Sequence, residues 1–207
     1  MTESSAAPSS AMPSSAAPEA RYVQTPAQTV GPFYGFALPY DGGAELVPGH
    51  HPRAIRLHGT VFDGAGDPVP DAILEIWQAD EAGALGSERG SLARDGFGFT
   101  GFGRAAVDFG GHYAFTTVKP GPVAGGAPYV LVTVFARGLI HHLFTRAYFP
   151  EHAGQNATDA VLTAVPASRR STLVCVAEET GRTGAASYRF DIHLQGENET
   201  VFLDFDA

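Results

Sequence analysis

Cysteine and positive charge are scarce in this sequence. A single cysteine, Cys175, occurs among 207 residues, so no disulfide can form within the chain, and a reducing compartment is favoured. It lies between Val174 and Val176 in a strand-like stretch, which predicts a buried thiol. Only 13 Lys and Arg oppose 22 Asp and Glu, a formal net charge of -9. A field of that sign repels phosphates, which argues against nucleic acid as a partner and means that an anionic ligand needs a local cation.

Long apolar runs are absent as well. No segment approaches the roughly 18 apolar residues of a membrane-spanning helix. The N-terminus lacks the basic flank and the continuous apolar core of a signal peptide. We therefore expect a cytoplasmic protein that does not interact with membranes.

The sequence also lacks the motifs of common hydrolases, zinc enzymes and nucleotide-binding proteins: HExxH, HxH, GxSxG and the Gly-rich phosphate loops. Eight histidines leave a metalloenzyme open as an alternative. Two adjacent pairs, His50–His51 and His141–His142, are poorly placed to chelate one ion, because neighbours on an extended chain point to opposite faces. The motifs alone predict neither a catalytic residue nor a metal ligand in this chain.

What the chain does contain divides it into three parts. Residues 1–21 are almost entirely Ser, Ala and Pro, which predicts a disordered tail. Residues 22–52 alternate aromatic residues with Pro and Gly without a periodic pattern, which predicts an extended arm. The aromatic side chains of this arm need cover from their own domain or from a partner chain. Residues 53–207 have a length suited to one domain.

Short strand-like segments dominate this third part, separated by Gly-, Pro- and Asp-rich turns. They are residues 55–63, 72–79, 112–118, 129–136, 143–149, 171–177, 187–194 and 200–205. The alternation in 187–194 places Tyr188, Phe190, Ile192 and Leu194 on one face. Residues 150–165 predict a short helix capped by Thr158 or Asp159, and the Gly-rich stretch 79–111 predicts an irregular loop. The predicted fold is an all-β sandwich with long loops.

Several separated segments carry a resemblance to a known family. They are "LHGTVFDGAGDPVPDAILEIWQAD" (57–80), "GHYAFTTVKPGPV" (111–123), "RAYF" (146–149) and "YRFDIHLQGENETVFLDF" (188–205). These segments resemble the intradiol aromatic-ring dioxygenases. "TPAQTVGPF" (25–33), "FARG" (135–138) and "LQGENETVF" (194–202) are most similar to the alpha subunits of two-chain members of that family. The resemblance covers essentially everything from Thr25 onward.

The resemblance implies a β-sandwich and an αβ protomer assembled into a larger oligomer. In that protomer the beta subunit holds a nonheme Fe(III) through two tyrosines and two histidines. The implied reaction cleaves protocatechuate (3,4-dihydroxybenzoate) with O2 to 3-carboxy-cis,cis-muconate, a step of aromatic catabolism in the beta-ketoadipate pathway.

The family's iron ligands are not matched in this chain. Leu85 or a neighbour stands where the first tyrosine is expected, and Val123 stands where the second is expected. The His-x-His pair aligns with Tyr129 and Leu131. One phenol oxygen cannot hold an iron ion that needs several protein ligands. We therefore expect the partner to hold the iron and this chain to be inactive alone.

A cation ends the apolar segment 129–136. On a straight strand Arg137 lies about 26 Å from Tyr129, too far to serve a pocket there. The resemblance implies that Arg137 faces the iron pocket of the beta subunit, and that Thr29, Gly31 and Pro32 of the arm line the same cavity as substrate-binding residues. An arginine can hold the substrate carboxylate by a charge-assisted hydrogen bond.

Alternative interpretations remain open at this point. Arg137 is otherwise a solvated strand-end residue or an ion-pair partner at the subunit interface, and "TVGPF" is otherwise a rigid hydrophobic anchor. For the whole chain, the alternatives are a stand-alone β-sandwich binding or interaction module and an independent hydrolase or metalloenzyme.

Overall fold

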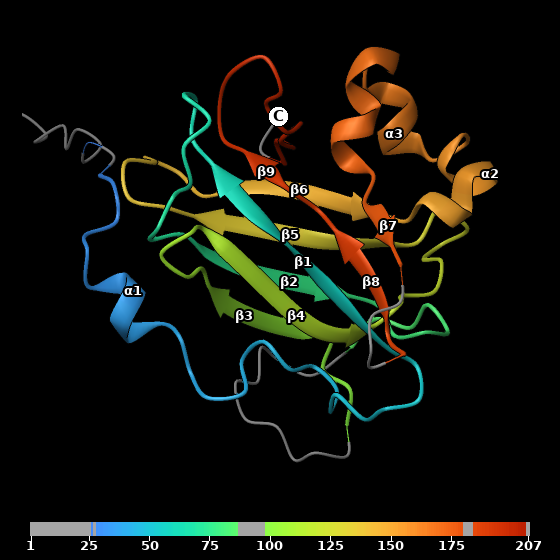
Figure 1. Ribbon diagram of the computed structural model, residues 1–207. Helices are drawn as coiled ribbons and strands as arrows, with labels where there is room; N and C mark the ends of the chain where they lie inside the picture. Colours follow the sequence, from blue (N-terminus) through green and yellow to red (C-terminus); the bar gives the residue numbers. More distant parts are fainter. Residues whose placement is uncertain (1–25, 27, 87–97, 180–183, 206–207) are drawn as a thin grey trace, which may run out of the picture.

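Two β-sheets packed face to face form the body of the molecule (Figure 1). The computed structural model describes residues 26, 28–86, 98–179 and 184–205. The strands are β1 (Ala54–Phe62), β2 (Ile73–Gln78), β3 (Phe102–Ala106), β4 (His112–Val118), β5 (Tyr129–Phe135), β6 (Leu143–Tyr148), β7 (Val176–Glu178), β8 (Ala186–Arg189) and β9 (Ile192–His193). The short helices are α1 (Tyr34–Ala37), η1 (Pro150–His152), α2 (Ala153–Asn156), α3 (Ala160–Ala164) and η2 (Ala167–Leu173).

The strand order confirms the predicted all-β sandwich. One sheet has the order β4-β1-β8-β7, with β9 also paired to β1, and the other has the order β3-β2-β5-β6. The second sheet is antiparallel throughout, whereas β1 runs parallel to β8. Among the described residues, no helix has the length and apolarity needed to cross a membrane.

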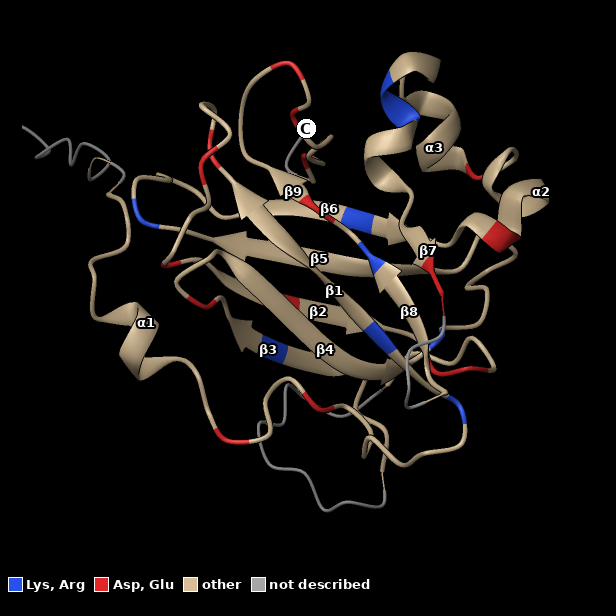
Figure 2. Cartoon of the chain, in the orientation of Figure 1, with Lys and Arg blue, Asp and Glu red and all other residues tan. Residues whose placement is uncertain are grey.

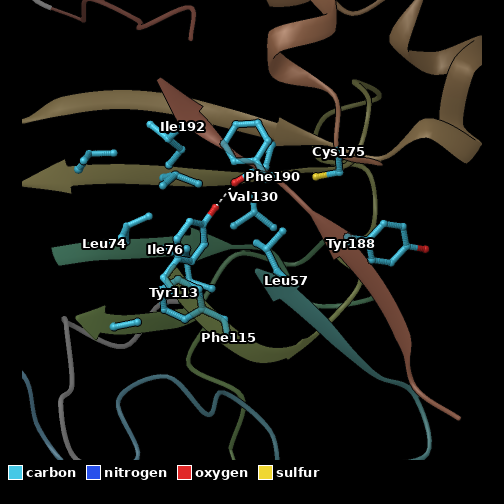
Figure 3. Close-up of a cluster of buried hydrophobic side chains, with 14 of the residues drawn as sticks. Leu57, Leu74, Ile76, Tyr113, Phe115, Val130, Cys175, Tyr188, Phe190 and Ile192 are labelled. Atoms are coloured by element: carbon cyan, nitrogen blue, oxygen red, sulfur yellow. Dashed lines mark hydrogen bonds between the residues drawn. The ribbon is translucent and has the colours of Figure 1, made fainter. Parts of the chain in front are cut away.

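The core lies between the two sheets and is built by strand alternation (Figure 3). In β5, Val130, Val132 and Val134 are at most 1% exposed and point inward, so the alternate residues face away from the core. Tyr113 is buried among these side chains, and its hydroxyl donates to the Phe190 carbonyl. The β5 strand is thereby fixed on one face, and its outward side chains have fixed positions.

The predicted buried thiol is confirmed. Cys175 is 3% exposed and belongs to the central core cluster. Burial raises the pKa of this thiol to about 12. The thiolate, which is the reactive form, is therefore not populated at neutral pH.

Three of the predicted strands are wrong in part or whole. In 171–177, the Thr172 hydroxyl donates back to the Arg169 carbonyl and supports helix η2, so the segment forms only an isolated bridge at Val174 before β7 begins. Segment 187–194 breaks into β8 and β9, because the Asp191 carboxylate takes the backbone N–H of Thr60. Its predicted alternation holds, since Tyr188, Phe190 and Ile192 are buried. Segment 200–205 forms an isolated bridge at Leu203 and no strand.

Strand β3 lies where an irregular loop was expected. Gly103 in this strand hid the strand pattern, and the structure explains the glycine, because a Cβ there would lie 2.5 Å from a Leu46 methyl group. The predicted single helix in 150–165 is instead divided into η1, α2 and α3. Asp159 caps α3, with its Oδ1 accepting from the backbone N–H groups of Val161 and Leu162 at 3.0 and 3.2 Å. Of the two proposed caps, Asp159 is the correct one.

The described part of the arm lies along its own domain. The Gly43 carbonyl accepts from the backbone N–H of Arg104 at 2.9 Å, and the Tyr34 hydroxyl donates to the Asp71 carbonyl. Two aromatic side chains of the arm stay uncovered, with Phe33 78% and Phe36 87% exposed. The domain therefore supports the arm without covering all of its apolar groups.

Candidate functional site

The two ends of β5 carry the two groups of residues singled out by the sequence. Tyr129 begins the strand, and Arg137 follows its last residue, Phe135. These ends lie on opposite sides of the sheet in Figure 1. A pocket at one end is therefore out of reach of a side chain at the other, as the length of the segment predicts.

The first end holds a cavity of about 250 Å³, which we call the β5 cavity. The residues that the sequence comparison sets at or near the expected ligand positions all line it: Leu85, Val123, Tyr129 and Leu131. The remaining lining residues are Trp77, Gln78, Ala79, Gly86 and Thr100. The fold thus brings together positions that are far apart in the sequence, although their side chains no longer form a ligand set.

Tyr129 is the one oxygen donor among those four side chains, and a cation lies against it. The Arg146 guanidinium is 3.9 Å from the centre of the Tyr129 ring. None of the ion pairs formed among the described residues involves Arg146, whereas Arg104 on the same sheet is paired with Glu75. Figure 2 shows the basic positions on β3 and β6 of this sheet. This donor set does not fit an Fe(III) ion, because a single phenol beside a fixed positive charge supplies neither the ligands nor the compensating negative charge.

A buried network holds the strand ends next to the cavity. The Tyr148 hydroxyl donates to Asp159 Oδ1 at 3.0 Å, and Asp159 Oδ2 accepts from the Ala127 backbone N–H at 3.1 Å. Burial raises the pKa of Tyr148 to about 12. Burial also acts to raise the pKa of Asp159, but hydrogen bonds from Leu162, Ala127 and Tyr148 outweigh it and lower that pKa. The cavity therefore has rigid neighbours, and they keep its shape.

The other end of β5 brings Arg137 together with the arm. Arg137 Nε lies 3.0 Å from Asp71 Oδ2, and the next residue, Gly138, donates its backbone N–H to Thr29 Oγ1 at 2.7 Å. Gly31 accepts a backbone hydrogen bond from Tyr34 at 3.3 Å, and Pro32 lies inside that turn. The four predicted substrate-binding residues therefore lie in two neighbouring segments joined by a direct hydrogen bond.

The positive charge of Arg137 is partly balanced by the Asp71 carboxylate and remains accessible to solvent. The Arg137 side chain is 60% exposed although Asp71 contacts one edge of it. Burial and the Asp71 carboxylate raise the pKa of Tyr34 to about 12, and the hydrogen bond from the Arg137 backbone and the Arg137 charge oppose this increase. Sequence reasoning missed Asp71 and the role of Tyr34. The only sequence feature that could have indicated a partner for Arg137 was the acidic residue Asp71, just before β2.

Apolar surface surrounds the Arg137 group. The exposed side chains are Phe33, Phe36 and Ile140, and a hollow of about 150 Å³ is lined by Val30, Phe135, Ala136, Leu139, Ile140, His141 and His142. The His142 ring packs against Phe135 in a tilted arrangement and against Phe144 edge to face, with centroid separations of 5.6 and 4.6 Å. His142 thus serves packing. Large exposed aromatic side chains beside a hollow are typical of an interaction surface.

One histidine cluster was not anticipated. His58 Nε2 lies 2.9 Å from Glu178 Oε2, and its other ring nitrogen lies 3.3 Å from His112 Nε2. The hydrogen bond with His58 lowers the pKa of Glu178. Across the described ranges, no group of three or more His, Cys, Asp and Glu is arranged to hold a metal ion.

Comparison with known proteins identifies the family. Residues 31–196 match the family model described as dioxygenase. The chain is 43% identical to a protocatechuate 3,4-dioxygenase alpha chain of Burkholderia cepacia over 87% of this chain and 97% of that one. It is 40% identical to the alpha chain of Pseudomonas putida, over 88% of this chain and 96% of that one.

More distant relatives include the other subunit and a solved structure. The protocatechuate 3,4-dioxygenase beta chain of Burkholderia cepacia is 29% identical over 84% of this chain and 77% of that one. The dioxygenase domain of a carbohydrate-binding fusion protein from Streptomyces sp. SirexAA-E superposes with a TM-score of 0.55 at 28% identity, covering 74% of this chain and 87% of that one. The family model covers most of the chain and the sandwich is shared, which confirms the expected resemblance: this chain belongs to the intradiol ring-cleavage dioxygenase family.

Proposed function

We propose that this chain is the alpha subunit of a protocatechuate 3,4-dioxygenase and acts on protocatechuate together with a beta subunit. The similarity to alpha chains over nearly the full length of both proteins supports this assignment. The family also contains beta chains that are recognisably related to this one, as expected for two subunits of one enzyme. The product of the joint reaction is 3-carboxy-cis,cis-muconate.

Iron binding is assigned to the beta subunit. The nonheme Fe(III) there supplies the ring-opening chemistry with O2. The donor set of the β5 cavity supports this division, because Leu85, Val123 and Leu131 offer no ligand atom and Tyr129 lies against Arg146. This chain alone is expected to be inactive.

The role of this chain is to complete the substrate pocket of its partner. The exposed guanidinium of Arg137, set in an apolar rim, is the observation that carries the proposal. Docking of a second chain on that rim would exclude water from around Arg137 and strengthen its interaction with the substrate carboxylate. A guanidinium group provides the local cation that an anion site in a net acidic protein needs.

The arm assists in this role. Thr29 is held in place by Gly138 and offers a hydroxyl group beside Arg137. Gly31 has open space around its Cα, so a ligand or a partner chain can approach its backbone closely. Pro32 stiffens the turn and reduces the entropy lost on ordering. We assign residues 22–52 to partner contact as well as substrate contact, and residues 53–207 to the sandwich domain.

A stand-alone binding module is the alternative function. It would leave Phe33, Phe36 and Ile140 in water permanently, which is unfavourable for side chains of this size. The exposed aromatic pair therefore favours the hetero-oligomer, and an αβ protomer within a larger assembly is the form that we propose.

Co-purification with a beta chain tests the assembly. The double variant Phe33→Ser/Phe36→Ser is expected to weaken retention of the beta chain on a tagged alpha chain, because it removes two exposed apolar groups of the rim. Phe109→Ser is the matched control, since Phe109 is 98% exposed and lies in the loop between β3 and β4. Equal retention by both variants would contradict the proposed docking surface.

A further inference from the structure

We propose that the β5 cavity binds one uncharged aromatic ring in the absence of a metal ion. A cavity of about 250 Å³ lies here, lined by the residues at which the family resemblance leads one to expect iron ligands. An apolar protein cavity of about 150 Å³ holds a benzene molecule, so one substituted ring fits here. This site belongs to the alpha chain itself and is independent of the pocket that we propose Arg137 to complete.

The walls of the cavity are suited to a flat apolar ligand. Trp77 and Leu131 are cross-strand partners on β2 and β5, and both line the cavity. Leu85 and Val123 add aliphatic groups, and Tyr129 adds a second aromatic ring. Contacts of a ring with aromatic and aliphatic side chains are individually weak but add up over its whole surface.

The polar groups of the lining explain why the ring must be uncharged. Among the lining residues that the structure describes, there is no Asp, Glu, Lys, Arg or His. Gln78 is already used, since its Nε2 donates to the Val118 carbonyl and its Oε1 accepts from Thr117, both at 2.8 Å. A carboxylate placed here would lose its hydration without gaining a cation from the described lining residues or a hydrogen-bond donor from Gln78.

Neighbouring contacts fix the two aromatic walls. Trp77 packs against Phe102 with a ring separation of 4.6 Å, and Tyr129 is held between Arg146 and Tyr148. Arg146 covers the Tyr129 ring and is not among the described lining residues. A preformed cavity of this kind binds a ligand with little cost in ordering its walls.

The single tryptophan of the chain provides a direct probe. Trp77 is the only tryptophan in the sequence, it lines the cavity, and it is 38% exposed. We therefore expect toluene to produce a saturable change in Trp77 emission when it is titrated into the full chain. If the chain is purified with its beta subunit, the difference from the same complex carrying Trp77→Phe isolates this signal.

Two variants and one ligand serve as controls. Val123→Phe fills the cavity and is expected to raise the apparent Kd for toluene at least about tenfold. Val176→Phe makes the same substitution on β7, outside this cavity, and is expected to leave the Kd unchanged. Benzoate at neutral pH is expected to bind at least about tenfold more weakly than toluene. A response that does not saturate, that persists in Val123→Phe, or that benzoate reproduces equally would overturn the proposal.

Discussion

Replacing Arg137 by alanine removes the guanidinium group that we propose to bind the substrate carboxylate. In the structure Arg137 contacts Asp71 through Nε and leaves 60% of its side chain exposed. A hydrogen bond between a charged donor and a carboxylate contributes about 2 kcal/mol, and its loss lowers kcat/KM for protocatechuate roughly thirtyfold. The assay is oxygen uptake by the complex of the variant with a beta subunit. The iron content is expected to stay unchanged, because the ligands belong to the partner.

The Arg137→Ala measurement has a matched control in the same chain. Arg53 is also exposed, at 69%, and also pairs with one carboxylate, Glu81 at 2.6 Å. Such surface pairs contribute at most about 1 kcal/mol to stability, so neither variant should unfold. Arg53→Ala should retain wild-type kcat/KM. If Arg137→Ala also retains it, the substrate-binding role of Arg137 is refuted.

Two further predictions concern stability and reactivity. Asp159 has a lowered pKa, so its carboxylate stabilises the fold above the usual carboxyl pKa of about 4, and this contribution is lost as the pH falls through the folded value. Denaturation over a pH series should show a shallower acid dependence for Asp159→Asn, and an identical slope would contradict the network around Tyr148. Cys175 should resist a maleimide at neutral pH in the native chain and react after unfolding, because burial raises its pKa to about 12. Rapid native labelling would contradict its burial.

Strand alternation was the most reliable part of the sequence-based reasoning. Period two predicted the inward positions of the segment 187–194, and Tyr188, Phe190 and Ile192 are buried as expected. Strand β3 could not be recognised, because Gly103 is dictated by a Leu46 side chain that approaches from outside the strand. The break between β8 and β9 depends on a hydrogen bond from Thr60 to Asp191, a contact between residues far apart in the chain.

In the candidate site, too, features set by the local sequence could be predicted, whereas contacts between distant segments could not. The length of the 129–136 segment separates Arg137 from Tyr129, and the structure has them at opposite ends of β5. Asp71 and Tyr34, which hold Arg137 in place, come from other segments and could not be predicted. The same is true of Arg146, whose position over Tyr129 depends on the pairing of β6 with β5. The roles of Arg137, Thr29, Gly31 and Pro32 toward substrate remain predictions.

Iron content and activity, each measured with and without a beta subunit, show directly which of the two chains holds the metal. The alpha chain is expressed alone, and together with a beta chain, and each product is assayed for iron content and for oxygen uptake on protocatechuate. We expect iron and activity only in the co-expressed complex. Stoichiometric iron on the alpha chain alone, or ring cleavage without a beta chain, would contradict it.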